Sequence, residues 1–239
     1  MTDSQYRRAD SSDDSRRKER SIVSSINSIL DHLVVVAADL EQGVAHCNAL
    51  LGTHMLKGGE HVRTGTHNYL LNLGQGIYLE VIAINPNAAP IAHPRWFGMD
   101  DNEQRQRLAS GPYLATFAAR TEDIASAAIP VLGPIVEMRR GDLKWDITIP
   151  DDGGLVENGA MPSLIQWPAS KHPTHAMPDA GCRLTRLEVH HPQPQYLAEQ
   201  WKRIGLEPEQ RLMICPSEAG AGPRLVAHID TPDGVRVLC

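Results

Sequence analysis

The stretch Leu30 to Ala37, Leu-Asp-His-Leu-Val-Val-Val-Ala, decides how the rest of the chain is interpreted. Its length and β-branched residues predict a buried strand that carries a single histidine, His32. Asp39 follows as a helix cap, with Gln42 three residues later as in a capping box, and Gly52 ends the helix. The apolar residues between them share one stripe: Leu40, Val44, Cys47 and Leu51. A buried strand followed by an amphipathic helix is therefore expected.

The composition is that of an ordinary soluble globular protein. The chain has 239 residues, of which 41% are hydrophobic and 22% are charged. A formal net charge of -6 and a pI near 6.0 argue against nucleic-acid binding and against a basic patch for a membrane surface. A small molecule is the expected partner, and a homodimer is the common default for assembly.

The cysteines and the N-terminus bear on where the protein acts. The four cysteines form no C-x-x-C pair, which excludes a zinc knuckle and a dithiol redox motif and fits a reducing compartment. No apolar run approaches the roughly 18 residues that span a bilayer, and no hydrophobic segment like that of a signal peptide is found, so we expect a cytoplasmic protein. Residues 1–24 mix both charges with almost nothing to bury, which predicts a disordered tail.

Two apolar runs, Asn68 to Leu73 and Ile77 to Ile84, are separated by Gly74-Gln75-Gly76 and predict a hairpin with a three-residue loop. Pairing Leu73 with Ile77 places Leu71 opposite Leu79 and Tyr69 opposite Val81, which gives one wholly apolar face. A two-residue loop would instead mix asparagines into that face. The expected register therefore puts Asn68, Tyr78 and Glu80 on the face away from the helix.

The same order of elements recurs along the chain. Pro86 to Gly98 is a proline-rich connection, and Asp101 to Ala109 predicts a polar helix. A second unit then combines a short helix from Asp123 to about Val131 with four strands: Tyr113 to Ala119, Ile135 to Arg139, Leu143 to Ile149 and Ser163 to Trp167.

A third unit begins at Leu184, where Leu-Thr-Arg-Leu-Glu-Val aligns with Leu-Asp-His-Leu-Val-Val at Leu30. It predicts a helix from Pro194 with Leu197, Trp201 and Ile204 on one stripe. Its remaining strands are expected at Leu212 to Cys215, Arg224 to Asp230 and Val235 to Leu238. The predicted fold class is α+β, built from repeated β-α-β-β-β modules. Residues 25–168 would form one domain of two modules, 29–84 and 113–168, and residues 181–239 a third, related β-α-β module packed on it.

Several motifs in this order resemble the glyoxalase-like branch of the vicinal oxygen chelate (VOC) superfamily. They are L-D-H-L-V-V-V-A-x-D-L from Leu30, G-T-H-N at Gly65 to Asn68, Y-L-E-V-I at Tyr78 to Ile82, R-W-F-G at Arg95 to Gly98 and L-T-R-L-E-V from Leu184. The resemblance covers roughly residues 29 to 238. It implies a cupped mixed sheet with helices outside and a site inside.

The resemblance also implies a metal site. In metalloenzymes of that superfamily, a His on the first strand and a Glu on the fourth strand of a module bind a divalent metal together with the equivalent residues of the partner module. His32 and Glu80 match those two positions. Imidazole and carboxylate suit Zn, Fe, Mn, Ni or Co, and such a metal would polarise two neighbouring substrate oxygens.

The sequence departs from the full ligand set. Aligning the second unit puts Thr116 at the position of His32 and Gln166 at the position of Glu80, and the third unit has Arg186 at the histidine position. A metal would then have two good ligands, whereas catalytic metals usually have about three protein ligands. The missing ligands weaken the case for a metal, and a metal-free protein is the alternative.

His32 and Glu80 are the candidate catalytic residues. His32 could be a metal ligand or a base, or a core histidine hydrogen-bonded to a neighbour. Glu80, among Tyr78, Leu79, Val81 and Ile82, must be paired, solvated in a cavity or protonated, and a buried carboxylate of this kind suits a general base.

The candidate substrate-binding residues surround this pair. Asn68 and Tyr78 would face the substrate, Arg95 and Trp96 could form a lid or simply pack in their loop, and Arg186 could bind an anion or pair with Glu188 or Glu80. The opposite wall would contain Thr116 and Gln166. The histidines at 172, 175, 190 and 191 lack helical or hairpin metal-site geometry and are expected at the surface.

The function expected from these residues is that of a lyase or isomerase acting on a small oxygenated or carbonyl compound around His32 and Glu80. A metal-free small-molecule-binding protein of the same fold and an extradiol-type dioxygenase with ferrous iron remain as alternatives. The chain has no G-x-S-x-G, H-E-x-x-H or G-K-[ST] motif, so serine hydrolases and nucleotide enzymes are not favoured.

Overall fold

The computed structural model describes residues 26–169 and 171–239, and the predicted N-terminal tail lies outside them. The first half of the molecule contains β1 (Ser28–Val36), α1 (Leu40–Leu51), β2 (Leu56–His61), β3 (Thr66–Asn72), β4 (Tyr78–Ile84), a 3₁₀ turn (Trp96–Gly98) and α2 (Asn102–Leu108). The second half contains β5 (Tyr113–Thr121), α3 (Ile124–Ala127), β6 (Ile135–Arg140), β7 (Leu143–Thr148) and β8 (Ser163–Gln166), with 3₁₀ turns at Pro130–Leu132 and Val156–Gly159.

A 3₁₀ turn at Pro173–Ala176 leads from β8 into the C-terminal part of the chain. That part contains β9 (Arg183–His191), α4 (Pro194–Arg203), β10 (Leu212–Pro216), β11 (Arg224–Thr231) and β12 (Gly234–Leu238). No helix in the described ranges has the length and apolar character needed to cross a membrane.

The first strand and helix form as their sequence predicts. The Asp39 carboxylate accepts a hydrogen bond from the backbone N–H of Gln42 at 2.9 Å, which satisfies one of the free donors at the start of α1. Gly52 ends α1 in the left-handed region, with φ of 66°. Strand β2 was not predicted, because Leu-Lys-Gly-Gly-Glu-His has no alternating apolar pattern and the strand lies at the edge of the sheet.

The β3–β4 hairpin has the predicted register. Leu71 pairs with Leu79 and Tyr69 with Val81, and the backbone N–H of Leu73 donates to Ile77 O at 2.9 Å. Glu80 is thereby placed on the face away from α1.

Helix α3 is shorter than the predicted Asp123 to Val131. It ends at Ala127, and Ile129 has extended backbone angles, φ −114° and ψ 152°. Pro130 explains this, because proline disfavours helical geometry at the residue before it and cannot donate a helical hydrogen bond.

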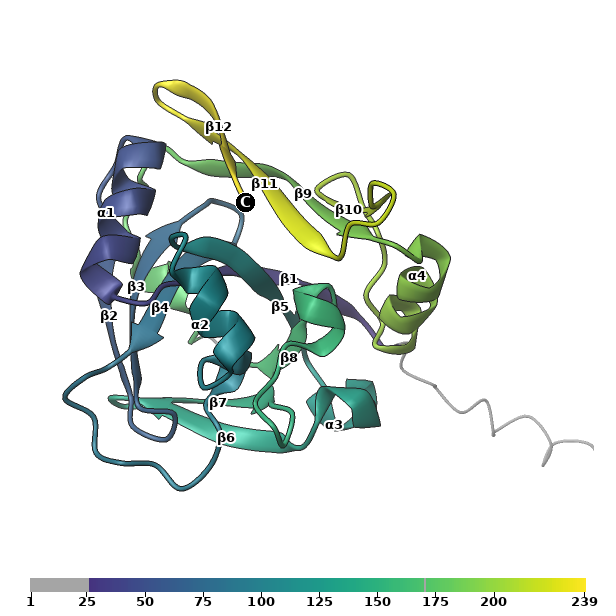
Figure 1. Cartoon of the computed structure of the whole chain (residues 1–239), viewed down its shortest axis with the longest axis horizontal. Coiled ribbons are helices and arrows are strands. Elements are labelled where there is room, and N and C mark those ends of the chain that lie inside the picture. The colour runs from purple at the N-terminus through teal and green to yellow at the C-terminus, as the bar shows by residue number, and fades with distance from the viewer. Residues whose placement is uncertain (1–25, 170) are drawn as a thin grey trace, which may run out of the picture.

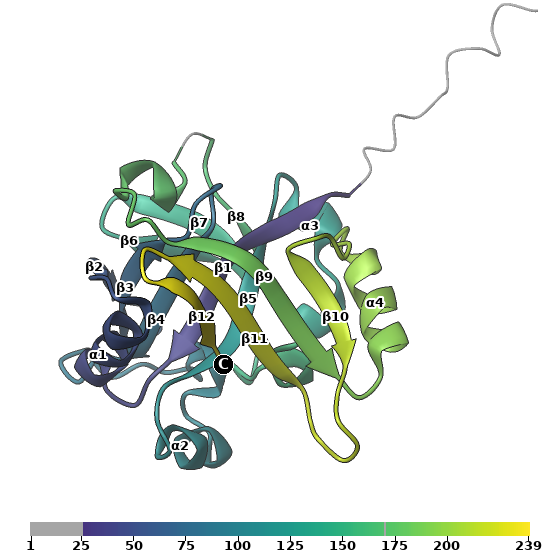
Figure 2. The ribbon, with the colours of Figure 1, turned by 90° about the horizontal axis from the view of Figure 1, so that it is seen from above.

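Two modules of identical strand order form one curved sheet of eight strands, β2-β3-β4-β1-β5-β8-β7-β6 (Figures 1 and 2). Within each module the first strand runs parallel to the fourth, and the modules join where β1 and β5 pair antiparallel. The two edges approach each other, since Gly59 of β2 lies against the side chain of Arg140 of β6. The sheet is therefore a nearly closed cup, and the predicted α+β class with VOC-type modules is confirmed.

Each of the two central strands contains a β-bulge. Between the pairs Leu30/Ala119 and His32/Ala118 the residue Asp31 has no partner across the ladder. Between the pairs Val34/Thr116 and Val35/Leu114 the same holds for Ala115. A bulge adds one residue to a strand and redirects side chains, and bulges are common beside active sites.

The C-terminal unit forms a separate sheet of four strands, β10-β9-β11-β12, which lies across the outside of the cup (Figure 2). Here the strand after the helix, β10, pairs directly and in parallel with β9, so this β-α-β unit differs in strand order from the two modules of the cup. Its Leu187 and Val189 share one buried apolar core with Leu33 and Val35 of β1.

A second apolar cluster fills much of the concave face of the cup. It contains Val34 and Val36 of β1 together with Trp96, Phe97 and Trp145. The connection after β4 thus brings two aromatic rings into the cup, which limits the open space to its mouth.

Candidate functional site

His32 has its imidazole oriented by the residue before it. The Asp31 bulge lets both side chains meet, and the Asp31 carboxylate accepts a hydrogen bond from Nδ1 of His32 at 2.6 Å. Both residues are buried, with 0% of Asp31 and 4% of His32 exposed. Because Nδ1 donates in this pairing, Nε2 is the nitrogen that faces Glu80.

Asp31 is at the centre of a buried hydrogen-bond network. Its Oδ2 lies 2.9 Å from Nε2 of His172, 3.1 Å from Nε1 of Trp167 and 3.4 Å from Nη1 of Arg120. Burial by itself raises the pKa of Asp31, but hydrogen bonds and charge interactions with His172 and His32 outweigh it and hold the pKa well below its usual range. Asp31 is therefore an anion at neutral pH, and it contacts three rings and one guanidinium.

Glu80 faces His32 from the neighbouring strand. Asn68 donates from Nδ2 to Oε1 of Glu80 at 2.5 Å, while Oε2 lies 3.7 Å from Nε2 of His32. The amide oxygen of Asn68 in turn accepts from the backbone N–H of Gly59 at 2.9 Å, which fixes the amide orientation. Glu80 is 5% exposed. One carboxylate oxygen is thus held by a neutral donor, and the other points toward an imidazole nitrogen.

Aromatic rings enclose this pair of residues. The ring of Tyr78 stacks on His32 with centroids 4.4 Å apart and an interplanar angle of 16°. His172 lies edge-on to Tyr78 at 5.9 Å. Burial, with the nearby charges of Asp31 and Glu80, raises the pKa of Tyr78 well above its ordinary value, so its phenol stays neutral.

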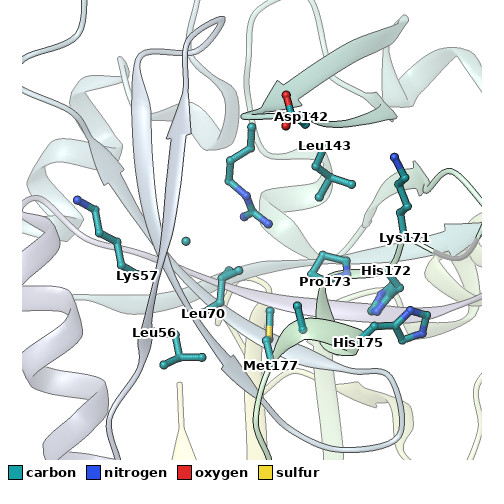
Figure 3. Close-up of a pocket in the computed structure, with 13 residues that line it drawn as sticks. Leu56, Lys57, Leu70, Asp142, Leu143, Lys171, His172, Pro173, His175 and Met177 are labelled. Carbon is teal, nitrogen blue, oxygen red and sulfur yellow. The ribbon is translucent and has the colours of Figure 1, made fainter.

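An open cleft of about 560 Å³ lies at the mouth of the cup, beside this array (Figure 3). Leu70 lines the cleft and is the cross-strand partner of Glu80. His172 lines it as well and contacts Asp31 behind it. The cleft therefore borders the buried array on two sides, and its volume is that of a small-molecule site.

The charged residues of the cleft are mostly cationic. Lys57, Arg140 and Lys171 contribute three cations, against the one carboxylate of Asp142. Burial and then the charge of Arg140 lower the pKa of His61 to about 3, so the field of Arg140 reaches residues behind the cleft wall. An anionic ligand matches this lining.

His172 and His175 also line a second hollow, of about 1030 Å³, on the other side of their segment. Arg120, Trp167 and Gln166 contribute to its wall. The segment after β8 therefore separates two open spaces, and the Asp31 network lies between them.

Arg95 and Trp96 pack within the fold. Arg95 bonds Asp100 through its guanidinium at 2.7 Å and through its backbone N–H at 2.8 Å. Trp96 is buried and donates from Nε1 to Thr66 at 3.3 Å, with its ring edge-on to His61. These contacts place both side chains in packed positions in this structure.

The second module offers different residues at the equivalent positions. The hydroxyl of Thr116 donates to the carbonyl of Gly159 at 3.0 Å and is buried. Gln166 lies away from His32, since its amide oxygen accepts from the backbone N–H of Ile124 at 2.8 Å and caps α3.

Strand pairing identifies the true counterpart of Glu80. Val34 lies three residues after the bulge residue Asp31 and pairs with Glu80. Ala118 lies three residues after the corresponding bulge residue, Ala115, and pairs with Ser163. Ser163 rather than Gln166 is therefore the counterpart, and the sequence alignment of β8 was three residues out of register.

Arg186 lies on the other sheet. Its Nε bonds Glu188 at 2.8 Å, and its Nη2 lies 3.2 Å from Nε2 of His228. It pairs with Glu188, as one of the sequence alternatives had it, and takes no part in the array around His32.

The donor set of the cup does not fit a catalytic metal with three protein ligands. His32, oriented by Asp31, and Glu80 have suitable chemistry and separation for two ligands. The symmetry-related positions hold Thr116 and Ser163, which are poor ligands for such metals. Within residues 26–169 and 171–239, the three-residue group with converging ligand atoms is Glu188, His190 and Cys215, and it includes neither His32 nor Glu80.

Asp31, His172 and Arg140 were not among the site residues predicted from the sequence. Asp31 carried a signal, since an acidic residue inside a β-branched strand has to be paired when buried. His172 was expected at the surface, but its ring closes the network on Asp31. Arg140 gave no signal, because its place in the cleft depends on the meeting of the two sheet edges.

The sequence matches the family model of the glyoxalase-like domain over residues 30–205. The chain belongs to this family. The resemblance to the VOC superfamily is thereby confirmed. No curated protein sequence matches the chain significantly.

Several solved structures are similar to this chain at low sequence identity. A hypothetical protein from Staphylococcus aureus is 15% identical, with a TM-score of 0.52 over 88% of this chain and 84% of that chain. A mutant of 4-hydroxymandelate synthase from Streptomyces coelicolor is 14% identical, with a TM-score of 0.48 over 89% of this chain and 62% of that one. Methylmalonyl-CoA epimerase in complex with methylmalonyl-CoA is 19% identical, with a TM-score of 0.39 over 62% and 99%.

Proposed function

We propose that this glyoxalase-like protein is a lyase or isomerase that moves a proton on a small anionic carbonyl compound in the cytoplasm. The observation that carries the proposal is the buried Asp31–His32–Glu80–Asn68 array beside the cationic cleft. Two groups that can exchange a proton face each other, and each is held by its own partner. Such preorganisation is what general acid–base catalysis requires.

The residues have distinct roles in this proposal. Oε2 of Glu80 removes the proton next to the substrate carbonyl, because Oε1 is engaged by Asn68. Nε2 of His32 holds or returns a proton, and Asp31 stabilises the imidazolium that forms. Arg140 and Lys57 bind the substrate anion, and Arg140 offsets the charge that develops on the carbonyl oxygen.

Access to Glu80 goes through the cleft wall. Neither His32 nor Glu80 lines the cleft, while Leu70 and His172 do. Displacement of the segment that carries His172 would open the array to a bound substrate.

The test uses metal-stripped protein in D₂O with a panel of small 2-oxo and 2-hydroxy acids. Proton NMR would show loss of the signal from the proton on the carbon next to the carbonyl, and Glu80→Gln would slow this exchange about 10²- to 10⁴-fold. If no compound that binds undergoes exchange or conversion, proton transfer is excluded.

A metal-free binding protein is the second candidate, and the near-complete burial of His32 and Glu80 favours it. It predicts thermal stabilisation by ligands of the same panel without turnover. An extradiol-type dioxygenase would need ferrous iron and would consume oxygen, but the cup offers two iron ligands rather than three.

A further inference from the structure

The outward face of the four-stranded sheet carries a polar cluster that the proposed function does not use. Along β9, Leu187 and Val189 point into the core, so Glu188 and His190 lie together on the opposite face. In the parallel ladder with β10, Cys215 is the direct partner of His190. Three ligand-type side chains are therefore adjacent on two rigid strands.

The ligand atoms of these residues converge. One atom each of Glu188, His190 and Cys215 lies within 4.8 Å of the other two. Oε2 of Glu188 lies 3.1 Å from Nε2 of His190. Two ligand atoms bound tetrahedrally to zinc at about 2.1 Å are about 3.4 Å apart, so small side-chain adjustments would suffice.

The surrounding groups hold the cluster in a ligating arrangement. Nδ1 of His190 lies 3.4 Å from the carbonyl of Pro216, a contact that leaves Nε2 to face Glu188 and Cys215. Oε1 of Glu188 is bound by Arg186 at 2.8 Å and lies 3.3 Å from Nε2 of His228. Oε2 is thus the oxygen directed at the cluster.

We propose that Glu188, His190 and Cys215 form a binding site for a divalent cation of the zinc type. The mixed set of one sulfur, one nitrogen and one oxygen favours Zn²⁺ or Co²⁺ over Mg²⁺ and Ca²⁺, which prefer oxygen ligands alone. Three protein ligands leave a fourth position for water or for Nε2 of His228. The site lies on the outer sheet and is separate from the His32–Glu80 array.

Cobalt titration tests this site directly. The full chain, stripped of metal and kept reduced by a phosphine, would be titrated with Co²⁺ alone. We expect about one Co²⁺ per chain, with a near-ultraviolet thiolate-to-cobalt band and strong tetrahedral visible bands, all displaced by Zn²⁺. Cys215→Ser should remove the thiolate band, and His190→Ala should weaken Co²⁺ binding at least about 100-fold.

Matched variants separate this site from others. Cys239→Ser removes the exposed C-terminal thiol and should leave the spectrum unchanged, as should His32→Gln in the cup. Far-ultraviolet circular dichroism confirms that each variant is folded. A spectrum without the thiolate band, or one that survives Cys215→Ser and His190→Ala, would overturn the proposal. Neither result bears on proton transfer at Glu80, which is assayed without metal.

Discussion

The two modules of the cup have the same strand order and the same bulge, yet they differ in the residues beside that bulge. In the first module the bulge residue Asp31 precedes His32, and Glu80 faces them. In the second module the corresponding bulge residue Ala115 precedes Thr116, and Ser163 stands in place of the glutamate. The backbone feature that redirects side chains is retained in both, but the ionisable groups are present in one.

The second module uses its bulge for packing. Thr116 bonds the carbonyl of Gly159, whose own backbone has φ of +92°. A Cβ atom at Gly159 would lie 1.9 Å from the carbonyl oxygen of Ala115, so the segment can approach the bulge only because it has glycine there. The comparison teaches that duplicated backbone geometry does not require duplicated ionisable groups.

The largest effect is expected when the ionisable pair is removed from the first module. Glu80→Gln and His32→Gln should each lower the rate of proton exchange about 10²- to 10⁴-fold, the range for loss of a general acid or base. Thr116→Val and Ser163→Ala, at the equivalent positions of the second module, should leave the exchange rate within about threefold of the wild-type rate. Rates would be measured by NMR in D₂O under identical conditions. Equal losses of exchange rate from the variants of the two modules would contradict the proposal that the first module alone carries the reacting groups.

Asp31→Asn should be the most destabilising single change in the array. It removes the anion that His32, His172, Trp167 and Arg120 share, and loss of one member of a buried ion pair costs about 3–5 kcal/mol. Urea denaturation at pH 7 measures this.

The pH dependence of stability gives a second check on Asp31. Because its pKa is lowered in the folded protein, its stabilising contribution is present above the unfolded value of about 4 and is lost as the pH falls further. The wild type should lose more stability than Asp31→Asn below pH 4. If Asp31→Asn were as stable as the wild type at pH 7, the result would contradict a stabilising role for the hydrogen-bond network around Asp31.

Strand β2 ends at His61 and strand β6 ends at Arg140. We expect His61 to make the free energy of unfolding depend on pH. Burial, with the charge of Arg140, lowers the pKa of His61 to about 3, so the folded protein keeps it neutral while the unfolded chain takes up a proton below about 6.5. Stability should therefore fall by about 1.6 kcal/mol between pH 6.5 and 5. Denaturation midpoints of wild type and His61→Gln at the two pH values measure this. The exposed His54→Gln variant is the control, and an equal slope in His61→Gln would refute the assignment.

The smallest effect concerns two neighbouring indoles with centroids 5.2 Å apart. Nε1 of Trp167 donates to Asp31, whereas Nε1 of Trp145 is buried without a partner in the described part of the chain. Trp167→Phe should therefore cost about 1.5 kcal/mol more than Trp145→Phe, the contribution of a hydrogen bond to a charged group. Thermal unfolding of the two variants measures the difference. Equal losses would mean that the indole bond to Asp31 adds nothing.

Local patterns predicted most of the first module. The register of β3 and β4 follows from keeping Leu71, Leu79 and Val81 on one face, and that register alone placed Glu80 and Asn68 away from α1. The helix ends at Asp39 and Gly52 follow from capping chemistry. These features depend on neighbours within a few residues, so they can be predicted from the local sequence.

Features that depend on distant pairing could not be predicted. The Asp31 bulge appears only when β1 pairs with β5, and it is what brings Asp31 and His32 together. Ser163 rather than Gln166 corresponds to Glu80 because of the β5–β8 register, which the short strand β8 does not reveal by its own pattern. His172 reaches Asp31 from a loop 141 positions later, where no periodicity applies.

The central claim is that the chemistry of the cup belongs to His32 and Glu80 and does not depend on a metal. The most direct test measures substrate proton exchange by Cys215→Ser, which lacks the thiolate ligand of the outer sheet, before and after removal of all divalent metal by a chelator. The account predicts the same exchange rate in both samples. Loss of exchange on chelation, with recovery on adding a divalent metal, would contradict it.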